Sequence, residues 1–335
     1  MDGKISIIGG GSWGTALAQV ASNNIKEVLI YARNNNVVES INNKNINSKY
    51  FNNIKLNKNI KATNDLDKII NFSKDIILSV PTAATRSVMK KIKDKITDTH
   101  TIISTAKGIE IDTFMTNSEI IREYFSGNIL VFSGPTHAEE VIKDIPTAIV
   151  IASNNKKLAE KYQEMLMTSK FRIYTIKDVK GVEIAGAVKN IIAVASGVTD
   201  GVGYGDNTKA ALITRGLAEI VKFGLYLNTN RETYNGLAGL GDLVVTCNSD
   251  HSRNRRFGIL IGQNKSFDEA KQTVNQVVEG AKTAKALYKY LQKHPDLEMP
   301  ITEEVYKVLY KNKNPHQAVD DLMLREPRNE FYYLS

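Results

Sequence analysis

Lys189 is a residue whose position ordinary core packing does not explain. It is the one charged residue of the apolar segment 184–196 (IAGAVKNIIAVAS), and no carboxylate lies three or four residues away on the expected helix. Burial lowers the pKa of a lysine, and an amine whose pKa lies near neutrality can move protons. The structural alternative is a lysine at a helix edge, with its stem on apolar surface and its ammonium in water. The segment therefore predicts either an acid–base catalyst or an ordinary surface lysine.

Three glycines near the start of the sequence form a second pattern with chemical meaning. Gly9, Gly11 and Gly14 have the spacing G-x-G-x-x-G and lie between an expected strand at 5–8 and an expected helix at 15–22. Such glycines permit a tight turn and a close approach of the backbone to a pyrophosphate, which the helix N-terminus also attracts. The motif alone is common in turns, but this strand and helix around it favour a dinucleotide site.

The end of the second expected strand, 28–31, indicates which dinucleotide binds. Enzymes that use NAD usually carry an acidic residue here for the ribose 2′-hydroxyl. This sequence has Arg33 and no carboxylate at that point. Because a guanidinium can pair with a 2′-phosphate, we expect NADPH to be accepted and preferred over NADH.

The elements that position these residues divide the chain into two parts. Apolar runs with the length of buried strands occur at 5–8, 28–31, 75–80, 101–105, 129–132 and 147–152. Segments long enough for crossover helices separate most of them, which predicts an α/β fold with a doubly wound, mainly parallel sheet. After residue 174 the sequence indicates helices and glycine-rich turns. We expect a dinucleotide-binding domain at 1–180 and an all-α substrate-binding and catalytic domain at 181–335.

Composition excludes several classes of protein. The length of 335 residues suits two domains, and the contents of 42% hydrophobic and 24% charged residues are typical of a globular protein. The sequence predicts no membrane span and no signal peptide, so we expect a cytoplasmic protein. A single cysteine, Cys247, excludes an internal disulfide and agrees with a reducing compartment.

The net charge of +8 does not by itself indicate nucleic acid or a membrane surface as a partner. Lysines are spread along the chain, and aromatic residues do not alternate with basic runs as a base-stacking surface requires. Nor do the histidines have metal-ligand spacing with one another or with the cysteine, so no metal is expected. A small anionic substrate suits the charge.

Six motifs in order along nearly the whole chain carry a family resemblance. They are residues 9–18 (GGGSWGTALA), 106–110 (AKGIE), 134–140 (GPTHAEE), 186–190 (GAVKN), 236–243 (GLAGLGDL) and 252–258 (SRNRRFG). With these motifs the sequence resembles bacterial NAD(P)-dependent glycerol-3-phosphate dehydrogenases. The resemblance implies reduction of dihydroxyacetone phosphate to sn-glycerol 3-phosphate for phospholipid synthesis, by a homodimer with a Rossmann domain and a helical domain.

The resemblance also implies a role for individual residues. Lys189, Asp242 and Lys107 would be catalytic, with Lys189 as proton donor and Asp242 holding it in place. The implied substrate-binding residues are Lys107, Gly134, Thr136, Lys189, Asn190, Asp242, Ser252, Arg253 and Asn254. The implied cofactor-binding residues are Gly9, Gly11, Ser12, Trp13, Gly14, Arg33, Lys107, Ala138, Arg253, Val277 and Glu279.

Residue chemistry supports some of these roles and leaves alternatives open. A serine, a guanidinium and an amide at 252–254, opening an expected helix, suit a phosphate, although the basic run could instead be a solvated face. Asp242 could be a surface helix cap. His137 could itself be the acid; burial favours Lys189, and we assign His137 to loop ordering.

Two other functions remain open at this point. One is a related lysine-dependent dehydrogenase of the 3-hydroxyacid or 6-phosphogluconate type, whose substrates carry a carboxylate. The other is a non-catalytic dinucleotide sensor that binds partners through its basic surface. Activity with dihydroxyacetone phosphate, and its loss when Lys189 is replaced, would separate the three.

Overall fold

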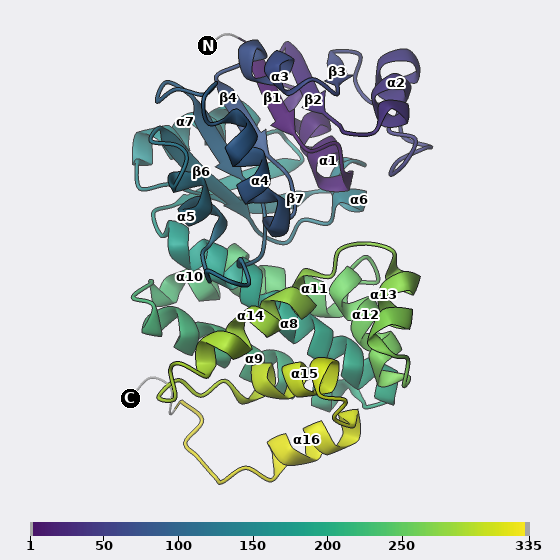
Figure 1. Ribbon diagram of the computed structural model, residues 1–335, viewed down its shortest axis with the longest axis vertical. Helices are drawn as coiled ribbons and strands as arrows, with labels where there is room; N and C mark the ends of the chain where they lie inside the picture. The colour runs from purple at the N-terminus through teal and green to yellow at the C-terminus, as the bar shows by residue number, and fades with distance from the viewer. Residues whose placement is uncertain (1–2, 332–335) are drawn as a thin grey trace. The chain divides into compact units, whose positions relative to one another are not determined.

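A computed structural model describes residues 3–331 of the chain (Figure 1). Eight strands between residues 4 and 176 form one sheet. The strands are β1 (Lys4–Ile8), β2 (Glu27–Tyr31), β3 (Ile60–Thr63), β4 (Asp75–Leu78), β5 (Thr101–Ser104), β6 (Asn128–Ser133), β7 (Thr147–Ala152) and β8 (Phe171–Ile176). Their order is β3-β2-β1-β4-β5-β6-β7-β8, and every neighbouring pair is parallel except β6 with β7. The predicted doubly wound, mainly parallel sheet is confirmed.

Helices cover both faces of this sheet, because successive residues of each strand point to opposite faces and both sets are apolar. Ile7 and Ile30 pack with α1 and α7, whereas Ile8 and Leu29 pack with α3 and α4. The helices are α1 (Ser12–Ala21), α2 (Asn35–Lys44), α3 (Leu66–Phe72), α4 (Thr82–Ile92), α5 (Asn117–Arg122), α6 (Ala138–Val141) and α7 (Lys156–Leu166).

Two strands of the sheet were not among those expected from the sequence. Both lie at an edge of the sheet, β3 at one end and β8 at the other. Alternate residues of β8 are exposed, and β3 contains the exposed Lys61. Edge strands lack the continuous apolar run of a buried strand, which is the signal that the sequence analysis used.

The second half of the chain is helical. Its helices are α8 (Val179–Val202), α9 (Asp206–Tyr226), α10 (Arg231–Asn235), the π-helical turn η1 (Leu237–Gly241), α11 (Asp242–Asn248), α12 (Arg253–Gly262), α13 (Phe267–Val274), α14 (Glu279–Leu291), α15 (Pro300–Tyr310) and α16 (Pro315–Met323). The predicted helical region after the sheet is confirmed. Helix α8 is long and apolar enough to cross a membrane. Its most apolar stretch, however, is completely buried in the core of the helical unit.

The contacts divide the chain into two compact units. The sheet unit contains the chain up to Ala106 together with Asn117–Val179, and the helical unit contains Lys107–Thr116 and the chain from Lys180 onward. Residues 107–116 lie within the dinucleotide-binding domain, 1–180, that the sequence predicts. In the structure this segment, which follows β5 along the chain, packs with the helices instead. The difference matters because the segment carries Lys107.

Candidate active site

Asp242 lies at the centre of a buried charge cluster in the helical unit. Its Oδ1 is 2.5 Å from Nζ of Lys189, and its Oδ2 accepts a hydrogen bond of 2.8 Å from Nζ of Lys107. The side chains of Lys189 and Asp242 are only 4% and 2% exposed, whereas that of Lys107 is 20% exposed. One carboxylate therefore pairs with two ammonium groups, of which one is enclosed by the protein and the other reaches solvent.

Thr246 completes the surroundings of the Lys189 ammonium. Its hydroxyl donates to the backbone carbonyl of Asp242, at 2.5 Å, and so presents a lone pair to Nζ of Lys189, at 2.6 Å. A lysine ammonium has three N–H donors. Within residues 3–331 two of them have protein partners, Asp242 and Thr246. A third donor is available for an oxygen atom of a ligand.

The charges of the cluster are set by burial and by mutual attraction. Burial lowers the pKa of Lys189 to about 8, although the Asp242 charge acts in the opposite direction. Burial also opposes ionisation of Asp242, but the two lysine charges outweigh it and lower the pKa of this carboxyl. At neutral pH Lys189 is thus a protonated amine close to its pKa, beside an ionised carboxylate. The surface-lysine explanation does not apply.

Three separate segments bring these side chains together. Lys189 lies within α8, whose other residues from 184 to 196 are all buried. Asp242 begins α11 directly after the π-helical turn η1, where a Cβ on Gly239 would lie 2.1 Å from the carbonyl oxygen of Tyr234. Glycine is needed for this close turn, and π-helical turns are frequent at functional sites. Lys107 comes from the segment 107–116.

A chain of buried amide groups joins Lys107 to the helices around it. Asn190 donates to the carbonyls of Lys107 and Gly186, both at 3.0 Å, and accepts from Asn254 at 2.9 Å. Asn254 in turn accepts from the backbone N–H of Gly280, at 3.0 Å. Both side-chain N–H groups of Asn190 therefore donate to backbone carbonyls. The side chain of Asn254 uses one of its two N–H groups in this network, and the other can donate to a ligand.

The start of α12 presents the groups that the sequence analysis assigned to a phosphate. Ser252 is the N-cap, and its hydroxyl oxygen accepts from the backbone N–H of Arg255 at 3.2 Å. Arg253, the first residue of the helix, is exposed, while Asn254 is buried. A helix N-terminus with a guanidinium beside it is suited to an anion.

The glycine turn lies in the sheet unit, between β1 and α1, at the point where the strand order reverses. Gly9 has φ of +133°, and a Cβ there would lie 2.0 Å from the carbonyl oxygen of Ser79, which follows β4. A Cβ on Gly14 would lie 1.9 Å from the Gly9 carbonyl oxygen, whereas Gly11 has nothing within 4 Å. Each position therefore needs glycine for a different reason: Gly9 for a tight turn, Gly14 for close packing, and Gly11 for open space in which a ligand can bind. The residues fit a dinucleotide pyrophosphate.

The other residues assigned to ligands lie in both units. In the sheet unit Arg33 is exposed just beyond β2, Gly134 has φ of +153° after β6, and the Thr136 hydroxyl donates to the Gly134 carbonyl. The remaining cofactor candidates of that unit are Ser12 and Trp13 in the first turn of α1 and Ala138 at the start of α6. Arg253, Val277 and Glu279 lie in the helical unit. Their ligand roles stay predictions.

Residue-by-residue reasoning missed Thr246 and the amide of Gly280. The sequence contains a signal for Thr246, because it lies four residues after Asp242 and so on the same face of α11. No sequence signal points to Gly280, whose backbone N–H donates to a side chain of another helix.

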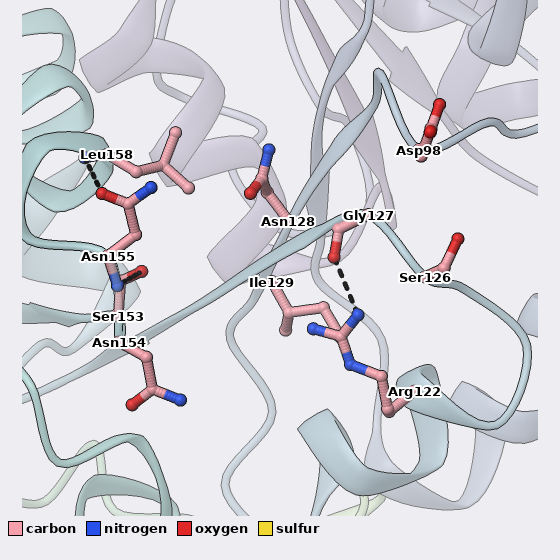
Figure 2. A pocket seen from close by; sticks show the side chains of 10 residues that line it. All are labelled: Asp98, Arg122, Ser126, Gly127, Asn128, Ile129, Ser153, Asn154, Asn155 and Leu158. Atoms are coloured by element: carbon pink, nitrogen blue, oxygen red, sulfur yellow. Dashed lines mark hydrogen bonds between the residues drawn. The ribbon is translucent and has the colours of Figure 1, made fainter.

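A polar hollow in the sheet unit is not a candidate for the reaction (Figure 2). It lies at the amino end of β6, where Arg122 donates to the Gly127 carbonyl and Asn155 accepts from the Leu158 N–H. The hollow also lies at the carboxyl end of the antiparallel β7, but its lining includes no residue of the glycine turn and no residue of the charge cluster. Arg122 and Ser153 stabilise local turns, and Asn155 caps α7.

Comparison with known proteins identifies the family. The N-terminal region of NAD-dependent glycerol-3-phosphate dehydrogenases matches residues 4–159, and the C-terminal region matches residues 178–320. The chain belongs to this family. The resemblance proposed from the six motifs is confirmed.

Individual relatives agree along almost the whole chain. A glycerol-3-phosphate dehydrogenase [NAD(P)+] of Halothermothrix orenii is 54% identical over 98% of this chain and 97% of its own length. One from Clostridium botulinum is 48% identical over 98% and 99%. The crystal structure of glycerol-3-phosphate dehydrogenase from Coxiella burnetii has a TM-score of 0.92 at 37% identity and covers 96% of this chain and 99% of that one.

More distant structures share the fold alone. A ketopantoate reductase from Ralstonia eutropha has a TM-score of 0.62 at 13% identity, covering 94% of this chain and 99% of that one. The same two-part architecture thus accommodates different reactions, so the fold does not specify the substrate.

Proposed function

We propose that this chain catalyses the reversible, NAD(P)H-dependent reduction of dihydroxyacetone phosphate to sn-glycerol 3-phosphate. The observation that carries the proposal is the buried Lys189, paired with Asp242 and close to its pKa, in a chain whose relatives at up to 54% identity are named glycerol-3-phosphate dehydrogenase [NAD(P)+]. The reaction supplies the backbone of glycerophospholipids.

Lys189 donates the proton that the reduction requires. Hydride addition turns the substrate carbonyl oxygen into an alkoxide, which needs a proton or a positive charge beside it. The ammonium of Lys189, oriented by Asp242 and Thr246, directs its remaining N–H to that oxygen. In the reverse direction the neutral amine accepts the proton from the alcohol. Asp242 keeps its negative charge throughout, since both lysines favour its ionised form.

Lys107 and the start of α12 bind the rest of the substrate. Lys107, the more exposed lysine on Asp242, adds positive charge near the oxyanion. Arg253, the free N–H groups of the α12 N-terminus and the remaining N–H of Asn254 bind the phosphate. Gly134 and Thr136 would contact substrate as in the family. From this division we expect the substrate to be a phosphorylated ketone.

The sheet unit binds the nicotinamide cofactor. The turn from Gly9 to Gly14 receives the pyrophosphate over the open space at Gly11, at the N-terminus of α1. When bound, NAD(P)H supplies the hydride. Arg33, exposed beyond β2, pairs with a 2′-phosphate and gives the preference for NADPH. We further propose a cytoplasmic homodimer, as the family resemblance implies, which light scattering during gel filtration would test.

The experiment that tests the function follows the absorbance of NADPH with the purified chain and dihydroxyacetone phosphate. We expect turnover with this substrate, and none with 3-keto acids that carry a carboxylate in place of the phosphate. Equal rates with both substrate classes would replace the proposal by a 3-hydroxyacid-type dehydrogenase. Cofactor binding without turnover of any substrate would indicate a dinucleotide sensor.

A further inference from the structure

Lys107 differs from Lys189 in the way the chain holds it. Lys189 is fixed within a long buried helix, whereas Lys107 opens the segment 107–116, which has no regular secondary structure. This segment leaves the sheet unit after Ala106, packs with the helical unit and returns at Asn117. Something in the segment must hold it to the helices if Nζ of Lys107 is to stay 2.8 Å from Asp242.

Phe114 is the aromatic residue by which the segment inserts into the helical unit. Its ring stacks on Tyr290 of α14, with centroids 4.1 Å apart and planes at 23°, and meets Phe223 of α9 edge-on at 6.0 Å. Tyr290 and Phe223 also contact each other edge-on, at 5.9 Å. The three rings form one cluster, and aromatic pairs of this kind stabilise beyond their buried area.

The backbone of Phe114 supports this interpretation. Its φ is +61°, a left-handed conformation that a bulky residue adopts only when its surroundings hold it there. Around it the segment closes on itself, since Phe114 N–H donates to the Glu110 carbonyl and Glu110 N–H donates to the Met115 carbonyl. The closed turn holds the backbone around Phe114, whose ring contacts the helices.

The segment also makes other contacts with the helices, among them the hydrogen bond of 3.0 Å from Asn190 of α8 to the Lys107 carbonyl. The ion pair between Asp112 and Lys289 joins side chains that are 87% and 52% exposed, and such pairs add little stability. Ile109 is buried in the helical core, but an aliphatic side chain does not set an orientation as a stacked ring does. Asn190 thus holds the start of the segment, and the Phe114 rings anchor its far end to α9 and α14.

We propose that Phe114 is a positioning residue for Lys107: by locking segment 107–116 onto α9 and α14, it holds the Lys107 ammonium on Asp242. The inference rests on the proposed dehydrogenase function for its kinetic consequence, but not for the anchoring itself. It explains why an aromatic residue with a strained backbone lies in a connecting segment.

Hydrogen–deuterium exchange on the full-length protein tests the anchoring. In Phe114→Ala we expect the amides of 108–116 to exchange roughly tenfold faster, with the rest of the helical unit unchanged. Tyr288→Ala is the matched control, because Tyr288 lies on the same helix as Tyr290 and its ring stacks on Tyr306 of α15. Unchanged exchange at 108–116 in Phe114→Ala would overturn the proposal, as would equal acceleration in both variants.

A double-mutant cycle tests whether Phe114 acts through Lys107. We expect Phe114→Ala to lower kcat/KM for dihydroxyacetone phosphate about tenfold in the wild-type chain, because small misplacements of catalytic groups are costly. In the Lys107→Ala background the same change should alter kcat/KM by less than about twofold. Phe114→Ala by itself should leave NADPH affinity, followed by fluorescence, unchanged. An equal loss in both backgrounds would mean a general structural role and overturn the proposal.

Two further measurements keep the outcome unambiguous. Phe114→Leu retains apolar volume without stacking, and it replaces the alanine variant if circular dichroism shows that Phe114→Ala does not fold. If the wild-type protein does not reduce dihydroxyacetone phosphate, the proposed function fails, and the exchange experiment still decides whether Phe114 anchors the segment.

Discussion

The glycine turn and the lysine–aspartate cluster achieve binding in opposite ways. The turn uses the backbone of one short stretch, and its glycines act because they have no side chain. A side chain at Gly9 would clash with Ser79, and the lack of one at Gly11 leaves open space. The cluster uses side chains from three separate segments, which meet at the buried carboxylate of Asp242. A backbone site depends on local dihedral angles, whereas a charge cluster depends on the packing of the whole helical unit.

The contrast extends to electrostatics. Helix α1 attracts an anion through the partial charges of its N-terminus, which do not titrate. The cluster holds full charges in a place with little water, where the pKa of Lys189 falls to about 8. The first site can bind over a wide pH range, and the second can exchange protons near neutrality. The four predictions below test this difference, from the largest expected effect to the smallest.

Replacement of Lys189 should separate chemistry from binding most strongly. In Lys189→Met we expect kcat to fall by about 10²–10⁴, because a positioned acid is lost, with NADPH affinity retained. The fold should persist, since Asp242 keeps Lys107 as a partner. Stopped-flow or steady-state absorbance measures kcat, and Lys271→Met, an exposed lysine of α13, is the control. Retention of most of the wild-type turnover would exclude Lys189 as the proton donor.

Two glycine variants should separate packing from ligand approach within the turn. Gly14→Ala places a Cβ 1.9 Å from the Gly9 carbonyl oxygen, so we expect a loss of stability of about 1–3 kcal/mol. Gly11→Ala meets no atom within 4 Å, and its melting temperature should be unchanged while NADPH affinity falls about tenfold. Thermal unfolding and fluorescence titration measure both. A similar destabilisation by the two variants would contradict the assignment.

The pH dependence of kcat/KM should follow the ionisation of the lysine–aspartate cluster, because the glycine turn has no titrating group. Because reduction needs protonated Lys189, kcat/KM for dihydroxyacetone phosphate should fall about tenfold per pH unit above about 8. Oxidation of glycerol 3-phosphate needs the neutral amine and should rise through the same range. Asp242 raises the pKa of Lys189, so Asp242→Asn should move both limbs to lower pH. A limb that stays in place would assign it to another group.

Replacement of Arg33 should have the narrowest effect, confined to the choice of cofactor. In Arg33→Ala we expect kcat/KM with NADPH to fall about tenfold, since a charge-assisted contact to the 2′-phosphate is lost. With NADH the value should not change, because that cofactor has no such phosphate. Steady-state rates with both cofactors decide the matter. A wild-type preference for NADH, unaffected by the substitution, would show that Arg33 does not select the cofactor.

The sequence by itself determined the sheet unit and the cofactor turn. The apolar runs of the central strands and the spacing of Gly9, Gly11 and Gly14 are local patterns, and each acts through residues next to it in the chain. The sequence did not predict the edge strands β3 and β8, because exposed positions interrupt their apolar pattern. The sequence also identified Lys189 as unusual, because it is a charged residue in an apolar helix.

Only the tertiary structure decided what surrounds that charge. Sequence reasoning without the family resemblance left Asp242 as either a cap or a site residue, and it gave no reason to pair it with Lys189. It placed segment 107–116 with the sheet, whereas the rings of Phe114 and Tyr290 place it with the helices. Side-chain pairing between distant segments depends on how helices pack, and no local spacing encodes that packing.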